Sequence, residues 1–159
     1  RNEIPNQFIL AGVWEMKMER WRTRRTRQFA NWNQIMVPQR WDYHGIKNYN
    51  HVAWYRKYFN LPKNFQKHNL SLILGKIDDF DEVFINGVKI GSTNDYKPFG
   101  ASNSWQQTRV YQIPPSCLKS YETNVIMVKV TDIGIDGGIY KGPIMIIPSE
   151  YTAAALRNF

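Results

Sequence analysis

The sequence predicts an all-β protein that forms one domain, a sandwich or barrel of about eight antiparallel strands. Three observations predict it. Many short segments alternate apolar and polar residues, as strands with one buried face do. No segment keeps an apolar period of 3.6 residues over the length of a helix, and residues 115–118 fit a single helical turn. The 159 residues suit one domain, and no low-complexity linker divides them.

The expected strands follow one another along most of the chain. In the first of them, Trp14, Met16 and Met18 alternate with polar neighbours, which predicts one buried face. The expected strands are residues 13–18, 35–37, 51–59, 70–74, 82–85, 88–90, 108–113, 124–130 and 144–147. Their large aromatic residues are expected in the core, namely Trp14, Trp54, Phe59 and Phe84.

A tight hairpin is predicted at Asn86-Gly87. This dipeptide separates residues 82–85 from residues 88–90, and it accepts positive φ at both central positions of a type I′ turn. The two flanking segments are therefore expected to pair as neighbouring strands.

The composition indicates a folded protein with aromatic residues to spare. Hydrophobic residues make up 43% of the chain and aromatic residues 14%, including six Trp and nine Tyr. Some of these rings are expected at the surface, where they stack on sugars, bases or partner proteins. Cys117 is the only cysteine, so an intrachain disulfide is excluded and the compartment stays open. A periplasmic or secreted bacterial location is favoured, and no apolar run is long enough to cross a membrane.

The positive charge is concentrated in one stretch. Residues 17–27 hold six of the 21 basic residues and one acid, Glu19. Arginines beside an aromatic residue are typical of polyanion binding, and a solvated surface is the alternative. The arginines of this patch, residues 22–27, are Arg22, Arg24, Arg25 and Arg27.

Two long polar connectors carry the candidate binding residues. Sugar rings stack on Trp and Tyr, while polar side chains hydrogen-bond the hydroxyls. The alternative is that these aromatic residues cover the ends of the sandwich. The candidates are Trp41, Tyr43, His44 and Tyr49 in the first connector, Tyr96, Phe99 and Trp105 in the second, and Asn94, Asp95, Asn103 and Arg109 as polar partners.

An acidic cluster precedes the predicted hairpin. Its members are Asp78, Asp79, Asp81 and Glu82. Neighbouring residues on an extended chain point to opposite faces, so Asp78 and Asp79 are not expected to line one pocket if they continue a strand. Capping of turns is the favoured role, with contact to a ligand or a calcium ion as the alternative.

No catalytic or metal-binding set is recognisable. The histidines His44, His51 and His68 lack the spacing of metal ligands, and no G-x-S-x-G elbow or phosphate loop occurs. We therefore expect no catalytic centre within this chain and no cofactor, with a structural calcium ion left open.

Seven blocks, in order along the chain, resemble a known family. They are Leu-Ala-Gly-Val-Trp at 10–14, Ile-Met-Val-Pro at 35–38 with Trp41, Val-Ala-Trp-Tyr-Arg-Lys-Tyr-Phe-Asn-Leu-Pro at 52–62, Leu-Gly-Lys-Ile-Asp-Asp-Phe-Asp-Glu-Val-Phe-Ile-Asn-Gly at 74–87, Arg-Val-Tyr-Gln-Ile-Pro at 109–114, Asn-Val-Ile at 124–126 leading to Val-Lys-Val at 128–130 and Asp132, and Gly-Gly-Ile-Tyr-Lys-Gly-Pro at 137–143. Together they resemble the sugar-binding β-sandwich of glycoside hydrolase family 2, which includes β-galactosidases and β-glucuronidases, and the related sandwich of sialate O-acetylesterases. The last block is closer to the esterase sandwich. The resemblance covers residues 8–147, and the basic residues 21–27 have no counterpart in it.

The resemblance implies a single jelly-roll β-sandwich of the galactose-binding-domain-like type. We expect it in residues 1–149, with residues 150–159 as a short helix or a linker. In these families the sandwich is not catalytic, because the chemistry lies in a separate barrel or α/β domain of the same or a partner chain. An Asp at the end of the strand that corresponds to residues 124–130 reaches the active site of that barrel in family β-galactosidases, which implies a substrate-positioning role for Asp132. The alternative for Asp132 is that it opens the glycine-rich turn that follows.

Three functional hypotheses follow. The first is a non-catalytic carbohydrate-binding domain that belongs to or derives from a glycoside hydrolase or a sialate O-acetylesterase. The second is a structural domain that packs on a catalytic hydrolase domain. The third is binding of an acidic glycan or, less expected, a nucleic acid through Arg22, Arg24, Arg25 and Arg27. No membrane partner is expected.

Overall fold

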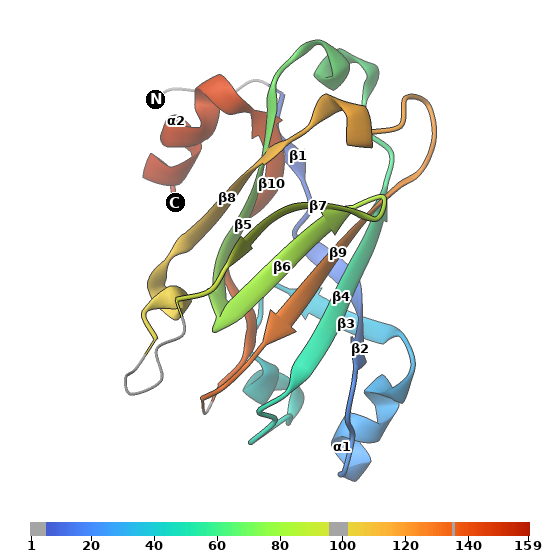
Figure 1. The fold of residues 1–159 in the computed structure, drawn as a ribbon, viewed down its shortest axis with the longest axis vertical. Coiled ribbons are helices and arrows are strands. Elements are labelled where there is room, and N and C mark those ends of the chain that lie inside the picture. Colours follow the sequence, from blue (N-terminus) through green and yellow to red (C-terminus); the bar gives the residue numbers. More distant parts are fainter. Residues whose placement is uncertain (1–5, 96–101, 135) are drawn as a thin grey trace.

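The protein is a two-layer β-sandwich. The computed structural model describes residues 6–95, 102–134 and 136–159. Within them, two antiparallel sheets of four and six strands face each other (Figure 1). This confirms the predicted all-β sandwich class.

The four-stranded sheet has the order β1-β10-β5-β8. Its long central pair joins segments about 70 residues apart, since Ile146 of β10 pairs with Leu72 of β5. The strands are β1 (Phe8–Ile9), β10 (Gly138–Pro148), β5 (Leu70–Asp78) and β8 (Thr108–Ile113).

The six-stranded sheet has the order β3-β2-β4-β9-β6-β7. Each pair is antiparallel, and β4 and β9 are paired along their whole lengths, from Val52–Thr131 to Phe59–Asn124. The strands are β3 (Asn33–Val37), β2 (Gly12–Met18), β4 (Val52–Phe59), β9 (Asn124–Thr131), β6 (Phe80–Ile85) and β7 (Val88–Thr93).

Every predicted strand lies in or overlaps an observed one. The prediction omitted β1, because two residues are too few to show alternation. The hairpin at Asn86-Gly87 is confirmed: it joins β6 to β7, and both residues have positive φ, of 50° and 82°.

Short helical segments fill the connections. The helices are α1 (Arg24–Arg27) and α2 (Thr152–Arg157), and the 3₁₀ turns are η1 (Gln28–Ala30), η2 (Trp41–His44), η3 (Lys63–Lys67), η4 (Ser104–Gln106), η5 (Pro115–Cys117) and η6 (Ser149–Tyr151). Helix α2 lies against the four-stranded sheet, where Ala155 packs with Ile73 and Met145. In the described part of the chain, none of these helices has the length and apolar character needed to span a membrane.

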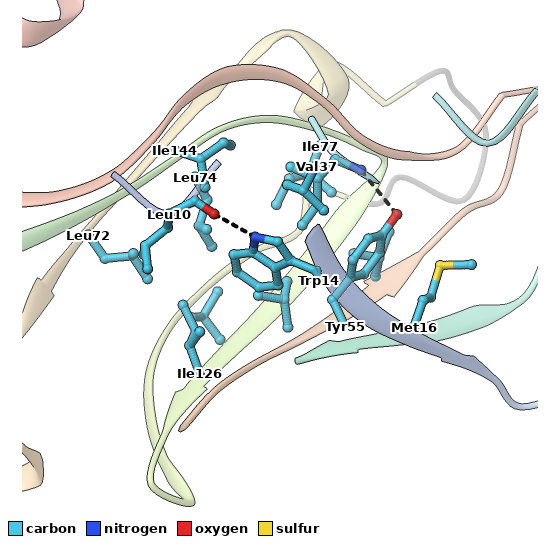
Figure 2. Packing of buried hydrophobic residues seen from close by; sticks show 14 of the residues in the cluster. Leu10, Trp14, Met16, Val37, Tyr55, Leu72, Leu74, Ile77, Ile126 and Ile144 are labelled. Atoms are coloured by element: carbon cyan, nitrogen blue, oxygen red, sulfur yellow. Dashed lines mark hydrogen bonds between the residues drawn. The ribbon is translucent and has the colours of Figure 1, made fainter. Parts of the chain in front are cut away.

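The core lies between the sheets and follows the period of the strands. In β9, Ile126, Val128 and Val130 are fully buried and point inward. Trp14 of β2 lies among them, and its indole N–H donates a hydrogen bond to the Leu10 carbonyl at 2.7 Å (Figure 2).

Two aromatic residues predicted in the core lie on the other face of their sheet. Trp14 and Phe59 are buried as expected, but Trp54 and Phe84 are only half-buried. Their rings meet on the outer face of the six-stranded sheet, 5.9 Å apart. Trp54 lies between Ala53 and Tyr55, which are buried, so the period of two places it outward.

A buried ion pair connects the two sheets. Arg109 of β8 donates from Nε to Asp81 Oδ1 of β6 at 2.6 Å, and both side chains are fully buried. The Tyr111 hydroxyl donates to the other oxygen of Asp81 at 2.5 Å. Burial raises the pKa of Asp81, and the charge of Arg109 opposes that rise.

We expect Arg109→Met to lower the free energy of unfolding by about 3–5 kcal/mol, because Asp81 would remain buried without its counter-charge. Urea denaturation followed by tryptophan fluorescence measures this change. The control is Lys89→Met, which removes an exposed partner of Glu82 and should change stability by less than about 1 kcal/mol. A loss in Arg109→Met no larger than in Lys89→Met would contradict this role for the buried pair.

Candidate functional site

Three aspartates meet at one end of the sandwich. Asp78 ends β5, Asp79 connects β5 to β6, and Asp132 follows β9. A carboxylate oxygen from each lies within 4.8 Å of the others. Figure 1 shows β9 ending and β4 beginning at this end, its lower end in the view, where α1 also lies. We call these three residues the aspartate cluster.

Backbone N–H groups hold two of the carboxylates in place. Ile133 N donates to Asp79 Oδ2 at 2.8 Å, and Gly134 N donates to Asp132 Oδ1 at 3.0 Å. Asp79 is 5% exposed and Asp132 is 1% exposed. Asp132 Oδ2 is buried, and among the described residues it has no hydrogen-bond partner.

The expectation that Asp78 and Asp79 would point to opposite faces of one strand is wrong. The chain leaves the four-stranded sheet at Asp78 and enters the six-stranded sheet at Phe80. The period of two therefore does not apply across these residues, and both carboxyls reach the cluster. Turn capping is nevertheless present, since Asp79 and Asp132 bond the backbone of the following loop.

Arg40 borders the cluster on its exposed side. Its guanidinium lies 3.9 Å from carboxylate oxygens of both Asp78 and Asp136. The same group lies 4.2 Å from the centre of the Tyr140 ring, a cation–π contact. The Tyr140 hydroxyl donates a hydrogen bond to the carbonyl of Trp105, whose side chain is 41% exposed. A series of contacts thus connects Asp78 through Arg40 and Tyr140 to the backbone of Trp105.

Crowding of the carboxyls favours their protonated forms. Burial, together with the neighbouring Asp79, raises the pKa of Asp78 to about 8, although Arg40 opposes the rise. Burial and the same neighbour raise the pKa of Asp132 to about 8. At neutral pH the cluster therefore retains protons that separate carboxyls would have released.

We expect the free energy of unfolding to fall as the pH rises from about 4 to about 8, because the folded protein holds protons that the unfolded carboxyls, with a pKa of about 3.9, have lost. Asp132→Asn should make this fall smaller. Urea denaturation at pH 5 and pH 8 in EDTA measures it, with Asp42→Asn, an exposed aspartate, as the control. An equal pH dependence in wild type and Asp132→Asn would show that the cluster does not hold these protons.

The aspartate cluster is also where the described residues could hold a cation. Calcium takes six to eight oxygen ligands, to which carboxylates contribute one or two oxygens each, and Asp132 Oδ2 has no other partner. The structural calcium left open by the sequence therefore stays a proposal, with Asp78, Asp79 and Asp132 as its ligands.

The aromatic residues of the first connector divide into buried and exposed ones. Trp41 is 1% exposed and its indole N–H donates to the Tyr55 hydroxyl at 2.6 Å. Tyr49 is 7% exposed and packs edge-on against Trp41. Both therefore cover the end of the core, which was the alternative to sugar binding for these residues. Tyr43 is 74% exposed, and His44 Nε2 is buried without a hydrogen-bond partner.

The second connector is more exposed. Trp105 presents its ring at the surface, whereas Tyr96 and Phe99 lie outside the described residues. Asp95 accepts hydrogen bonds from the Ser102 hydroxyl at 2.5 Å and from Asn103 N at 2.9 Å, which shapes the loop. Binding of sugar by Trp105 and Tyr43 stays a prediction.

Arg109 was expected to bind sugar hydroxyls, but the structure places it inside the protein, where it bonds other residues. Besides its bond to Asp81, its guanidinium donates to the carbonyls of Asp79 at 2.6 Å and Gln107 at 2.7 Å, and to that of Ser104. All three guanidinium nitrogens therefore already donate to acceptors within the protein, which distinguishes Arg109 from a residue that is available to a sugar. Sequence alone could not distinguish it from an exposed arginine at the start of a strand.

A groove on the outer face of the six-stranded sheet was not anticipated. It has a volume of about 300 Å³, and Trp32, Trp54 and Met127 provide its apolar lining. Arg56 stacks on Trp32 at 4.1 Å and pairs with Glu15 at 2.8 Å. The alternation of β4, applied with Ala53 and Tyr55 inward, is the signal that could have placed Trp54 there.

We expect Trp41→Ala to lower the free energy of unfolding by about 3–5 kcal/mol, because it empties a buried site and removes the shorter of two hydrogen bonds that the Tyr55 hydroxyl accepts. The close packing is shown by Gly137, where an added Cβ would lie 2.3 Å from the Trp41 ring. Trp105→Ala, at an exposed site, should cost less than about 1 kcal/mol. Thermal and urea denaturation compare the two, and equal stability of both variants would show that Trp41 does not close the core.

The fold places the chain among antiparallel two-sheet β-sandwich domains. A family model described as the second all-beta domain of β-galactosidase matches residues 19–136. The chain belongs to this family of β-galactosidase domains.

Known glycosidases contain similar domains. A β-glucuronidase of Formosa agariphila is 32% identical over 82 residues, which are 51% of this chain and 7% of the relative. A β-D-glucuronidase structure from Dictyoglomus thermophilum aligns with 83% of this chain, with a TM-score of 0.62 and 20% sequence identity. The aligned part is 20% of the glucuronidase chain. A Bacteroides uniformis β-glucuronidase structure aligns with 89% of this chain, with a TM-score of 0.64 and 18% sequence identity. The aligned part is 17% of the β-glucuronidase chain.

These matches bear on the resemblance seen in the sequence. They support its glycoside hydrolase family 2 part and identify the chain as a β-domain of the kind found in β-galactosidases. The chain spans about a fifth or less of the relatives it matches. The link to sialate O-acetylesterases stays a prediction.

Proposed function

We propose that the chain is a sugar-contacting accessory domain of a β-galactosidase or β-glucuronidase of glycoside hydrolase family 2, with a galactose-binding-like jelly-roll fold. It acts beside a catalytic domain. Its aspartate cluster positions a sugar through Asp132 and takes no part in bond cleavage.

The observation that carries this proposal is the unpaired Asp132 Oδ2. A buried carboxyl oxygen without a partner is unfavourable by about 1–3 kcal/mol. A sugar hydroxyl both donates and accepts, so it would satisfy this oxygen whether Asp132 is ionised or protonated. Asp132 follows β9 at the end of the sandwich, the position that the family resemblance associates with substrate contact.

The surroundings of Asp132 favour a sugar over other ligands. Arg40, Asp78 and Asp136 offer both donors and acceptors, which suits hydroxyl groups. Tyr140 links this polar region to Trp105, whose exposed ring can stack on the apolar face of a pyranose.

The aspartate cluster is unsuited to glycosidic catalysis by itself. A retaining glycosidase needs two carboxyls about 5–5.5 Å apart that flank the scissile bond across an open cleft. Here the carboxyls crowd against one another, and two of them are almost fully buried and bonded to backbone N–H groups. Positioning is therefore the role that fits, and a purely structural role is the alternative.

We expect methyl β-D-galactoside to bind with a dissociation constant on the order of 1 mM, as one ring with few buried contacts should. An NMR titration of ¹⁵N-labelled protein measures it. The reporters are the amides of Ile133 and Gly134, which bond the cluster.

Asp132→Asn should abolish the shifts of these two amides, and Asp42→Asn, at an exposed site, should leave them. Shifts that persist in Asp132→Asn would rule out this binding mode. No shifts with any variant or sugar would favour the structural alternative.

A further inference from the structure

A second cavity lies beside the aspartate cluster, between two loops. It has a volume of about 270 Å³. Arg20, Arg22 and Thr23 line it from the connection after β2, and Lys47, Asn48 and His51 line it from the segment before β4. We call it the basic pocket. The sequence analysis singled out the arginines for an anion and Tyr49 for a sugar, but it did not connect them with Lys47, which lies 25 residues after Arg22.

Hydrogen bonds within the loops fix the walls of the basic pocket. Thr23 and Thr26 form a capping box at α1, in which Thr26 N donates to Thr23 Oγ1 at 3.1 Å. Thr26 Oγ1 also accepts from Arg22 N at 3.2 Å. The Tyr49 hydroxyl accepts from Arg20 N at 3.2 Å and donates to the Val52 carbonyl at 2.7 Å, which ties the two loops together.

Two other arginines of the basic stretch, residues 17–27, have different contacts. Arg25 packs against the second loop, where a Cβ added to Gly45 would lie 3.0 Å from its Nε. Arg27 lies over the Trp21 ring at 5.4 Å. Arg20 and Arg22 are therefore the arginines of residues 17–27 that line the pocket.

The side chains that line the basic pocket carry positive charge, and no carboxylate among them neutralises it. Arg20, Arg22 and Lys47 bring three positive charges, and no aspartate or glutamate is among the lining residues. Within the described residues, no ion pair joins these three side chains to a carboxylate. Such a site attracts an anion, and two guanidinium groups favour a planar carboxylate that accepts paired hydrogen bonds.

We propose that the basic pocket binds the carboxylate of a uronic acid unit in an acidic glycan. This inference rests on the proposed sugar-contacting function and adds the class of sugar. The volume lies just below the range of about 300–1,000 Å³ for whole small-molecule sites, which suits one sugar unit of a longer chain. Thr23 and Asn48 are placed to bond its hydroxyls.

The position of the pocket beside the aspartate cluster gives the glycan a direction. Asp132 N donates to the His51 carbonyl at 3.2 Å, so the two sites share a backbone contact. The basic pocket attracts a carboxylate, and the aspartate cluster, whose carboxyls keep protons at neutral pH, offers no such attraction. The acidic unit therefore occupies the pocket while a neutral unit faces Asp132.

A nucleic acid fits the basic pocket less well. Single-stranded nucleic acids need exposed aromatic rings on which bases stack, together with a groove that follows several phosphates. The tyrosine that lines this pocket, Tyr49, is 7% exposed, and its ring packs against Trp41 and His51 at 5.5 Å each. The pocket therefore lacks a stacking surface from this residue.

Isothermal titration calorimetry of the chain with tetragalacturonate tests the proposal. The fully methyl-esterified tetragalacturonate serves as the uncharged probe, and a 12-nucleotide oligothymidylate as the nucleic acid probe. We expect tetragalacturonate to bind at least tenfold more tightly than either, because only the free acid supplies a carboxylate on a sugar ring.

The variant Arg22→Gln/Lys47→Gln should weaken tetragalacturonate binding at least tenfold. The matched control is Arg24→Gln/Lys63→Gln, which removes the same charge at exposed sites outside the pocket and should change affinity less than twofold. Thermal denaturation checks that both variants fold, and Arg22→Lys/Lys47→Arg, which keeps the charge, provides a second reading if the first variant unfolds.

Three results would overturn the proposal: no tetragalacturonate binding, equal losses in the pocket and control variants, or tighter binding of the oligothymidylate. Binding of methyl β-D-galactoside, read at Ile133 and Gly134, should survive Arg22→Gln/Lys47→Gln. Failure of the basic pocket is thereby distinguished from failure of the proposed function, which is read through Asp132→Asn.

Discussion

The ion pair between Arg109 and Asp81 is the contact on which the functional end of the sandwich depends. It joins β8 of one sheet to β6 of the other with both charges fully buried. The same guanidinium bonds the Asp79 carbonyl, so it also holds the segment where the chain passes between the sheets. A buried charge is tolerated only when it is paired and hydrogen-bonded, and that requirement fixes the relative position of β6, β8 and the turn at Asp79.

Two sites of different chemistry lie at this end of the sandwich, one made of carboxyls and one of basic side chains. The aspartate cluster forms where β5 ends and β9 ends, and the basic pocket forms from the loops on either side of β3 and η2. The backbone bond between Asp132 and His51 places them side by side. Because only the basic pocket attracts a carboxylate, an acidic glycan bound across both sites would lie in one direction.

Local patterns were sufficient for the strands and the hairpin. The period of two in β2 and β9 depends only on one face being buried, and Asn86-Gly87 needs only its own backbone freedom to form the turn. The same reasoning failed at Trp54, because hydrophobicity alone does not tell which face of a two-sided aromatic strand is inward. It also failed at Asp78 and Asp79, because the strand period ends where the chain changes sheets.

The sequence by itself determined that this protein is an all-β sandwich, and its motifs showed the resemblance to a glycosidase domain. It also determined that Asp132 follows a core strand and that the positive charge of the protein is concentrated in one stretch. Tertiary structure decided the rest. It buried Arg109, Trp41 and Tyr49, gathered three aspartates from two strand ends, and added Lys47 to the arginines of a distant loop. These outcomes depend on pairing between residues that are far apart in the chain, and no local pattern of residues encodes the distance between two loops.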